Sequence, residues 1–238
     1  MALNIVIHKN IMIKILKDIY SDATIGPILA FKGGTAAYLF YELARFSVDL
    51  DFDLLDAEKE DYVFGRVKNI LEKYGVLKEA SKKRFNLFYL LSYSEKIKGG
   101  QNVKLEINRR DFNSKYDVRP YLGIPMKVMT QEDMAAHKMV AMYERFGTTN
   151  RDIFDVWFFL QNDWPINKEI IEKRTGMLFR ELLEKCIDLL EKMDNSNILS
   201  GMGELLTPKQ KDWVKAKLKD EVIFQLKLRL ENEKERKF

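Results

Sequence analysis

Cysteine and histidine are scarce in this chain of 238 residues, which has one cysteine and two histidines. One cysteine cannot form a disulfide bond within the chain, and so few ligands exclude zinc sites built from paired cysteines or a His-Glu-x-x-His helix. A metal ion in this protein would therefore need oxygen ligands. No apolar run approaches the roughly 20 residues that cross a membrane, so the sequence predicts a soluble, cytoplasmic protein with no membrane partner.

An excess of one charge is also missing over most of the chain. The 40 basic residues exceed the 36 acidic ones by four, and residues 207–238 alone hold ten basic and six acidic residues. The remaining 206 residues are balanced, which excludes nucleic-acid binding by net charge alone but allows a local basic surface. Hydrophobic residues make up 46% of the chain, enough for the core of one large or two small domains.

The apolar pattern predicts an α/β first half and a helical second half, with the boundary near Pro120 and Pro125, which are expected to lie in a loop. Helices are expected in the first half near residues 5–19, 36–45 and 62–74, and strands near residues 28–31, 47–55, 86–92 and 102–109. The second half is expected to be wholly helical, with helices near residues 134–146, 152–161, 177–193 and 212–235.

Apolar and acidic residues alternate over residues 48–54, which places Asp49, Asp51 and Asp53 on one face of the expected strand. Neighbouring carboxylates destabilise one another's charged form unless a cation neutralises them. Because only oxygen ligands are present, Mg²⁺ or Mn²⁺ suits this cluster best. A half-exposed edge strand whose outer face is merely acidic is an equal alternative on this pattern alone.

Gly33, Gly34 and Thr35 lie between an expected strand and an expected helix. Backbone N–H groups at a helix start can bind an anion, and the Thr35 hydroxyl adds a donor. A Gly-Gly pair alone is more typical of a tight turn. Together with the acidic strand one short helix later, however, it predicts a nucleoside triphosphate site with its metal ions.

Four sequence blocks in this order resemble the AbiEii/AbiGii nucleotidyltransferase toxins, within the polymerase β nucleotidyltransferase superfamily. The blocks are Phe-Lys-Gly-Gly-Thr at 31–35, Arg-Phe-Ser-Val-Asp-Leu-Asp-Phe at 45–52, Lys-Leu-Glu at 104–106, and 138–155 with its final Arg-Asp-Ile-Phe-Asp. They span about half of the chain, and the last eighty or so residues contribute no motif. The resemblance implies an α/β (α+β) nucleotidyltransferase fold in residues 1–128, a small mixed sheet flanked by helices. A helical bundle in residues 129–238 would complete the active-site cleft.

The resemblance also implies roles in the first domain. Asp49, Asp51 and Glu106 would hold two metal ions, with Glu106 helping to deprotonate the attacking hydroxyl. The β- and γ-phosphates would be bound by the segment that contains Gly33, Gly34 and Thr35. Asp53 is expected to be a bystander, because the motif needs only two aspartates.

In the helical domain, the resemblance assigns Lys138 to the triphosphate of an NTP and Arg151 to the nucleotide. Asp152 is favoured as the functional acid, with Asp155 as the alternative, although both would also suit the start of a helix. His137 is expected to be structural because it points about 100° away from Lys138. Cys186 is expected to be a small core residue.

The implied activity is transfer of a nucleoside monophosphate from an NTP to an acceptor, with release of pyrophosphate. The acceptor would be the 3′ end of tRNA, another RNA or a protein, and the chain would be a toxin with a cognate antitoxin. Two alternatives stay open: a binding protein that has lost turnover, and a housekeeping nucleotidyltransferase that acts on a small molecule. Five lysines of the C-terminal segment are candidate RNA contacts: Lys209, Lys211, Lys215, Lys217 and Lys219.

Overall fold

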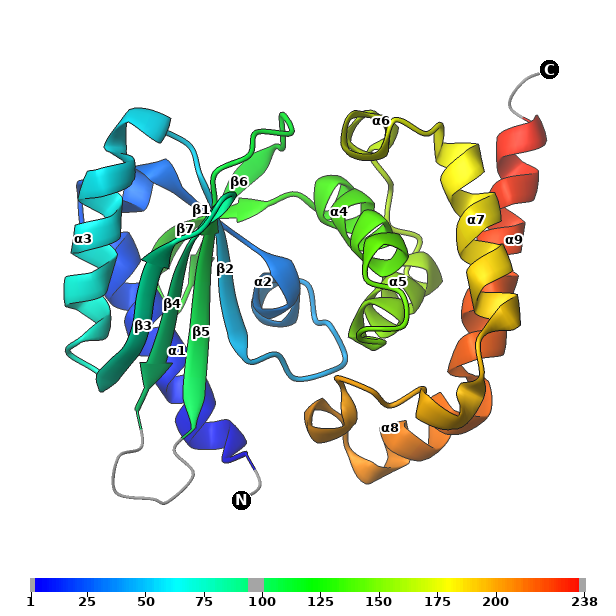
Figure 1. The fold of residues 1–238 in the computed structure, drawn as a ribbon, viewed down its shortest axis with the longest axis horizontal. Helices are drawn as coiled ribbons and strands as arrows, with labels where there is room; N and C mark the ends of the chain where they lie inside the picture. Colours follow the sequence, from blue (N-terminus) through cyan, green and yellow to red (C-terminus); the bar gives the residue numbers. More distant parts are fainter. Residues whose placement is uncertain (1–2, 94–100, 236–238) are drawn as a thin grey trace. The chain divides into compact units, whose positions relative to one another are not determined.

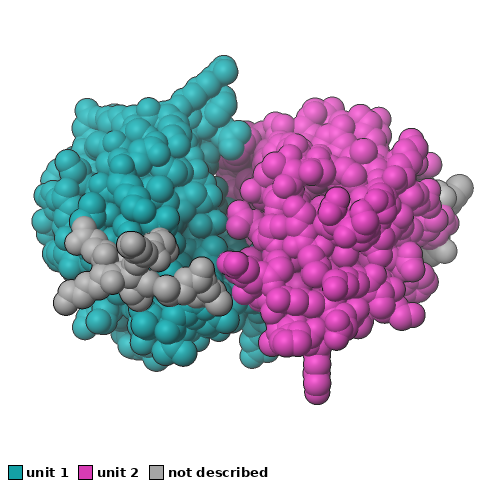
Figure 2. Space-filling view, turned by 60° about the horizontal axis from the view of Figure 1, so that its bottom comes forward, with its two compact units in different colours: residues 1–111, 115–130 teal, residues 112–114, 131–238 magenta. Residues whose placement is uncertain are grey.

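The computed structural model describes residues 3–93 and 101–235, which form two compact units (Figures 1 and 2). Unit 1 consists of residues 1–111 and 115–130, and unit 2 consists of residues 112–114 and 131–238. Within the described ranges, every helix is too short or too polar to span a lipid bilayer.

Unit 1 is built on a mixed sheet of seven strands in the order β3-β4-β5-β2-β1-β7-β6. Its strands are β1 (Leu29–Lys32), β2 (Asp49–Leu54), β3 (Val76–Lys82), β4 (Asn86–Ser92), β5 (Asn102–Asn108), β6 (Tyr116–Tyr121) and β7 (Ile124–Met129). The pairs β2–β5 and β1–β7 are parallel, and the other neighbours are antiparallel. The strand order puts β2 near the middle of the sheet, with β5 on one side and β1 on the other.

Helices cover the two faces of this sheet unequally. Figure 1 shows α1 (Ile5–Ser21) and α3 (Glu60–Leu71) on one face, and the short α2 (Gly33–Phe40) on the other. The Phe52 ring of β2 packs against Phe31 of β1 and Tyr20 of α1, with ring centroids 5.2 and 6.4 Å away. Since side chains alternate along a strand, the apolar residues of β2 face α1 and its aspartates face the side of α2.

Unit 2 is helical. It contains α4 (Gln131–Glu144), α5 (Arg151–Gln161), α6 (Lys168–Thr175), α7 (Phe179–Lys192), α8 (Pro208–Trp213) and α9 (Lys219–Glu235), with a π-helical turn over Val214–Leu218. Helix α7 packs against α9. Apolar residues four positions apart line the buried side of the last segment: Val214, Leu218, Val222 and Leu226, all fully buried.

The fold class is confirmed as a mixed α/β sheet followed by helices, and two expectations about its parts are wrong. Pro120 and Pro125 do not lie in a loop but pair with each other in the β6–β7 hairpin. Strand β3 is absent from the expected elements. Both β3 and β6 are edge strands in which no side chain is fully buried, so they lack the apolar alternation that identifies a strand. Proline is tolerated at a sheet edge.

Two further differences concern helices. The helix expected over residues 36–45 is α2, which begins at Gly33 and ends at Phe40. Helix α6 is absent from the expected elements because it is short and strongly polar, with only Ile170 and Ile171 buried.

The carboxylate of Asp53 joins three strands. It accepts hydrogen bonds from Lys32 Nζ at 2.5 Å, Asn108 Nδ2 at 2.7 Å and Tyr116 Oη at 2.9 Å. These donors come from β1, the end of β5 and the start of β6. Asp53 is only 6% exposed, so its carboxylate is hydrogen-bonded to these three donors in place of water. In this structure the third aspartate of β2 is a structural residue of the sheet.

We expect Asp53→Ala to lower the free energy of unfolding by about 2–4 kcal/mol, because it leaves three partly buried donors without their acceptor. Urea denaturation measures this change. The control is Asp117→Ala on β6, whose exposed carboxylate lies 3.6 Å from Arg119 and should contribute less than about 1 kcal/mol. Equal effects of the two substitutions would contradict the structural role of Asp53.

Candidate functional site

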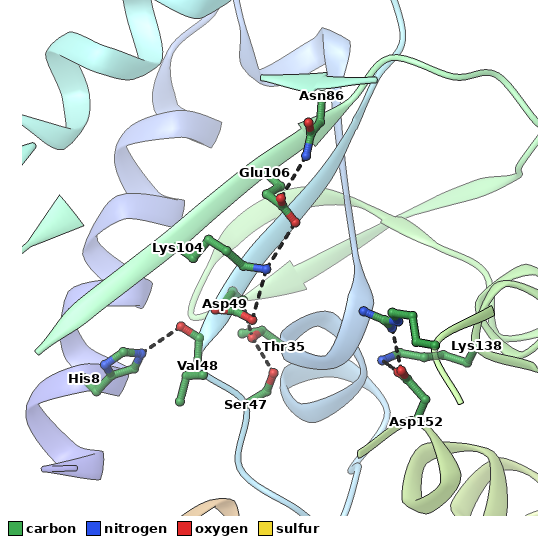
Figure 3. Close-up of polar contacts among 11 residues, drawn as sticks. His8, Thr35, Ser47, Val48, Asp49, Asn86, Lys104, Glu106, Lys138 and Asp152 are labelled. Atoms are coloured by element: carbon green, nitrogen blue, oxygen red, sulfur yellow. Dashed lines mark hydrogen bonds and ion pairs between the residues drawn. The ribbon is translucent and has the colours of Figure 1, made fainter. Parts of the chain in front are cut away.

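A row of acidic side chains lies on the face of the sheet opposite α1. The parallel pairing of β2 with β5 aligns Asp49 with Lys104 and Asp51 with Glu106. The residues between them, Leu50 and Leu105, are fully buried on the other face. Alternation and register together therefore bring Glu106 to the face that carries Asp49 and Asp51, more than fifty residues earlier in the sequence. Figure 3 shows Asp49 and Glu106 on this face.

Lys104 lies among these carboxylates. Its Nζ is 3.2 Å from Glu106 Oε2 and 3.6 Å from Asp49 Oδ2. Although burial opposes the charge on Lys104, the fields of Asp49, Asp51 and Glu106 outweigh it and raise the pKa of the ammonium above its usual value. Figure 3 shows the resulting line of side chains, which ends where Asn86 Nδ2 donates to Glu106 Oε1 at 2.8 Å.

The glycines at the start of α2 allow the helix to begin against this acidic row. Gly33 has φ +78°, in the left-handed region, and a Cβ there would lie 2.5 Å from Asp51 Oδ2. A Cβ on Gly34 would lie 2.8 Å from Ser47 Oγ. Any side chain at these two positions would collide with the residues that lead into β2. The first turn of α2, with its backbone N–H groups, is therefore next to the Asp51 carboxylate.

Thr35 was expected to offer its hydroxyl to a phosphate, and in this structure the hydroxyl has another role. Thr35 is fully buried. Its Oγ1 donates to the backbone carbonyl of Asp49 and lies 3.0 Å from Ser47 Oγ (Figure 3). The hydroxyl thus ties α2 to the start of β2 and fixes the backbone that carries Asp49.

His8 of α1 also contacts the backbone directly before β2, and no sequence pattern predicted this contact. His8 Nε2 lies 2.9 Å from the carbonyl of Val48 (Figure 3). Its Nδ1 lies 2.7 Å from Tyr93 Oη. Burial lowers the pKa of His8 below its usual 6.5, against the effects of the Val48 carbonyl and Asp49. A carbonyl oxygen can only accept, so the neutral ring donates from Nε2 to Val48. A lone histidine on an amphipathic helix gave no signal that would have identified it.

In unit 2 a second charged cluster is formed by the start of α5 and the side of α4. Lys138 Nζ is 3.0 Å from Asp152 Oδ1 and 2.7 Å from Asp155 Oδ2. Arg145 Nη2 lies 2.6 Å from Asp152 Oδ2. Both aspartates are fully buried, so the two cations are what makes their burial tolerable. Lys138 binds Asp152 and Asp155 alike, and its role at a nucleotide stays a prediction.

The other candidate residues of unit 2 have different surroundings. Arg151 is half-buried at the first position of α5. His137 has Ser114 Oγ 2.8 Å from its Nε2 and Arg174 Nη1 3.0 Å from its Nδ1, which agrees with a structural role. Cys186 is buried, and burial raises the pKa of its thiol to about 12.

The C-terminal lysines differ from one another. Lys209, Lys215 and Lys217 are exposed. Lys219 instead donates to the backbone carbonyls of Glu191 and Met193, at 3.2 and 2.7 Å. A cation at the last carbonyls of a helix stabilises its dipole, so Lys219 caps α7 and does not belong to an open basic surface.

The ligand atoms of the acidic row suit a hard divalent cation, but their arrangement in this structure does not form an ion site. Asp49, Asp51 and Glu106 supply only carboxylate oxygens, which Mg²⁺ and Mn²⁺ prefer, and the Lys104 ammonium already stands among them as a cation. However, in residues 3–93 and 101–235 no three side chains of His, Cys, Asp or Glu are grouped as ligands of one ion. The cluster binds positive charge, and Lys104 supplies it.

One family model matches most of the chain. The family model described as nucleotidyl transferase AbiEii toxin, Type IV TA system, matches residues 14–221. No curated protein sequence matches the chain significantly.

Solved structures share the fold over nearly the whole chain. JHP933 of Helicobacter pylori has a TM-score of 0.61 at 21% identity, covering 99% of this chain and 97% of its own. A putative nucleotidyltransferase of H. pylori has a TM-score of 0.61 at 22% identity, with 98% of both chains covered. MenT4, a nucleotidyltransferase toxin of Mycobacterium tuberculosis, has a TM-score of 0.52 at 16% identity, covering 91% of this chain and 82% of its own.

The lowered pKa of His8 makes a prediction about stability and pH. As the pH falls below about 6.5, His8 takes up a proton in the unfolded chain before it does so in the folded chain, so the free energy of unfolding should fall. His8→Gln lacks this titration. Urea denaturation at pH 8 and pH 5 should therefore show that the advantage of the wild type over His8→Gln shrinks by about 1 kcal/mol at the lower pH. An advantage that is the same at both pH values would contradict a neutral, buried His8.

Proposed function

Because the chain belongs to the nucleotidyl transferase AbiEii toxin family and is a nucleotidyltransferase, we propose that it transfers a nucleoside monophosphate from an NTP to a hydroxyl group at the 3′ end of an RNA such as tRNA. Pyrophosphate is the second product. The reaction would use Mg²⁺ or Mn²⁺, and blocking the 3′ ends of cellular RNA would halt growth. A cognate antitoxin protein would then control the toxin.

One observation carries this proposal: Asp51 of β2 lies in register with Glu106 of β5, and the glycine start of α2 lies against Asp51. Acidic residues on two neighbouring strands supply oxygen ligands for metal ions, and a helix start supplies N–H groups for phosphates. A nucleoside triphosphate with its metal ions needs carboxylate ligands for the metal and N–H groups for the phosphates, close enough together to contact one triphosphate.

The residues of unit 1 take distinct roles in this reaction. Asp49 and Asp51 would hold the metal ions, which when bound polarise the α-phosphate and offset the charge of the leaving pyrophosphate. Glu106 accepts the proton of the attacking hydroxyl as a general base. Gly33 and Gly34 leave room for the triphosphate to approach the backbone N–H groups of α2. Thr35 and His8 act on the carboxylates only through the backbone of β2, so they are positioning residues.

Lys104 has a specific consequence in this proposal. Its ammonium lies between Asp49 and Glu106, so it competes with a metal ion for these two carboxylates. A metal ion held by Asp49 and Glu106 would replace the positive charge that Lys104 supplies to them. The expected roles of Lys138, Asp152 and Arg151 of unit 2 at the nucleotide stay predictions.

The test of the activity is transfer of label from each of the four α-labelled NTPs to total tRNA in the presence of Mg²⁺. We expect Asp51→Asn and Glu106→Gln to reduce transfer by at least about a hundredfold, because each removes a carboxylate from the reacting centre. Asp117→Asn on β6 is the matched control and should keep wild-type transfer. Expression in a bacterial host should arrest growth with the wild type and not with Asp51→Ala. Equal harm from both proteins, or no labelled RNA with any NTP, would refute the proposal.

The role of Lys104 is tested by binding and stability in place of turnover. Without metal, Lys104→Met leaves like charges unbalanced, and we expect the melting temperature to fall by about 2–4 °C. Mn²⁺ should bind the variant about tenfold more tightly by calorimetry and should raise its melting temperature more than that of the wild type. Lys78→Met, at an exposed position of β3, is the matched control. Unchanged Mn²⁺ affinity in Lys104→Met would contradict competition between the ammonium and the metal.

A further inference from the structure

The strand order of unit 1 constrains the side from which the acceptor approaches. In nucleotidyl transfer the attacking oxygen and the leaving pyrophosphate lie roughly in line, on opposite sides of the α-phosphorus. Strand β1, which leads into Gly33 and Gly34, is on one side of β2, and β5 with Glu106 is on the other. If the glycines face the triphosphate, the acceptor lies beyond Glu106, over β4.

Strand β4 presents an aromatic residue at this place. Phe88 pairs directly with Glu106 in the antiparallel β4–β5 ladder, where side chains of such a pair lie about 5 Å apart on the same face. The ring of Phe88 is only half-buried. Lys83 Nζ lies 3.2 Å from its centroid. The surface next to Glu106 therefore combines a flat apolar ring with a cation.

The turn between β3 and β4 extends this surface with a second aromatic ring. Phe85 is 43% exposed, and the guanidinium carbons of Arg84 and Arg110 lie 4.8 and 4.9 Å from its centroid. Arg110 follows the end of β5, two residues beyond Asn108, so the two guanidinium groups come from separate segments. Both arginines are exposed. We refer to Lys83, Arg84, Phe85, Phe88 and Arg110 as the aromatic–basic surface.

The acidic residues of α3 beside this turn pair with other cations of the turn. Glu60 pairs with Lys82 at 3.2 Å and Arg109 at 2.9 Å, on the α3 side of the turn, and the Arg109 hydrogen bond lowers the pKa of Glu60. Asp61 also pairs with Lys82. These contacts occupy Lys82 and Arg109, and Lys83 Nζ lies 3.3 Å from Glu79 Oε1. The guanidinium groups of Arg84 and Arg110 lie over the Phe85 ring.

We propose that the aromatic–basic surface is the acceptor subsite and binds the unpaired 3′-terminal nucleotides of an RNA. Aromatic rings and guanidinium planes stack on exposed bases, and the cations contact the phosphates between them. This inference deepens the proposed function and rests on it for the direction of attack. It assigns RNA recognition to unit 1 and not to the C-terminal lysines, of which Lys219 is already committed to α7.

The test measures binding of a fluorescent RNA hairpin with four unpaired 3′ nucleotides, and of the same hairpin with a blunt end, in the absence of NTP. The wild type should bind the overhang about tenfold more tightly than the blunt end. Phe85→Leu should abolish this preference, and Phe85→Trp, which keeps a stacking ring, should retain it. The double substitution Arg84→Gln with Arg110→Gln should weaken binding and lower the slope of log K against log salt by about 1 to 2.

Two matched controls lie in unit 2: Phe224→Leu, at a phenylalanine that is 61% exposed on α9, and Arg180→Gln, at an exposed arginine of α7. Neither should change RNA binding. Melting temperatures of all variants within about 2 °C of the wild type would exclude unfolding as the cause of lost binding. NTP affinity should be the same in every variant, because the surface lies on the acceptor side.

The outcomes separate this subsite from the proposed function. If Phe85→Leu binds and labels RNA as the wild type does, the subsite is refuted and the transferase function stands. If the wild type shows a Phe85-dependent preference for the overhang but transfers no label, the RNA subsite stands and the proposed reaction is refuted. A wild type that binds neither hairpin, or that labels only protein, would refute the subsite.

Discussion

The concentration of negative charge on β2 and β5 is the constraint on which the rest of unit 1 depends. Like carboxylates this close destabilise one another, and three sources of positive charge or hydrogen-bond donors compensate them. Asp53 has the Lys32 ammonium and two neutral donors. Asp49 and Glu106 share Lys104. Asp51 lies at the start of α2, where the helix dipole favours an anion. Without these contacts, the two strands would not keep four acids on one face of the sheet.

The sequence was informative where a pattern repeats locally. The alternation over residues 48–54 predicted β2, its buried face and its acidic face, and the alternation of Val103, Leu105 and Ile107 with polar residues did the same for β5. Local patterns cannot carry the register between strands that are fifty residues apart, although that register decides which side chains meet. The sequence therefore predicts that Lys104 lies on the polar face of β5, but it does not predict that its ammonium lies between Asp49 and Glu106. The same limit hid the contact of His8 with Val48, which joins α1 to β2 across forty residues.

Edge strands and short polar helices escaped prediction for a related reason. Sequence patterns report burial, and β3, β6 and α6 bury few side chains. Thr35 illustrates the opposite error. A hydroxyl beside two glycines suggests a phosphate donor, but in this fold the same hydroxyl is enclosed and holds the carbonyl of Asp49. Burial thus makes Thr35 a residue that positions the backbone of β2.

The location of positive charge shows why net charge is a poor guide to nucleic-acid binding. The C-terminal segment 207–238 has ten basic and six acidic residues, but its cations are partly used within unit 2: Lys219 caps α7 and Lys227 pairs with Glu191 at 2.7 Å. Residues 82–85 and 109–110 include five basic residues, and Glu60 and Asp61 lie beside them. Folding pairs those acids with Lys82 and Arg109, and it brings Arg84 and Arg110 to one exposed ring. The fold thus determines where a basic surface lies, because it determines which cations are paired with acids. The register of β4 with β5 places Phe88 of the aromatic–basic surface beside Glu106.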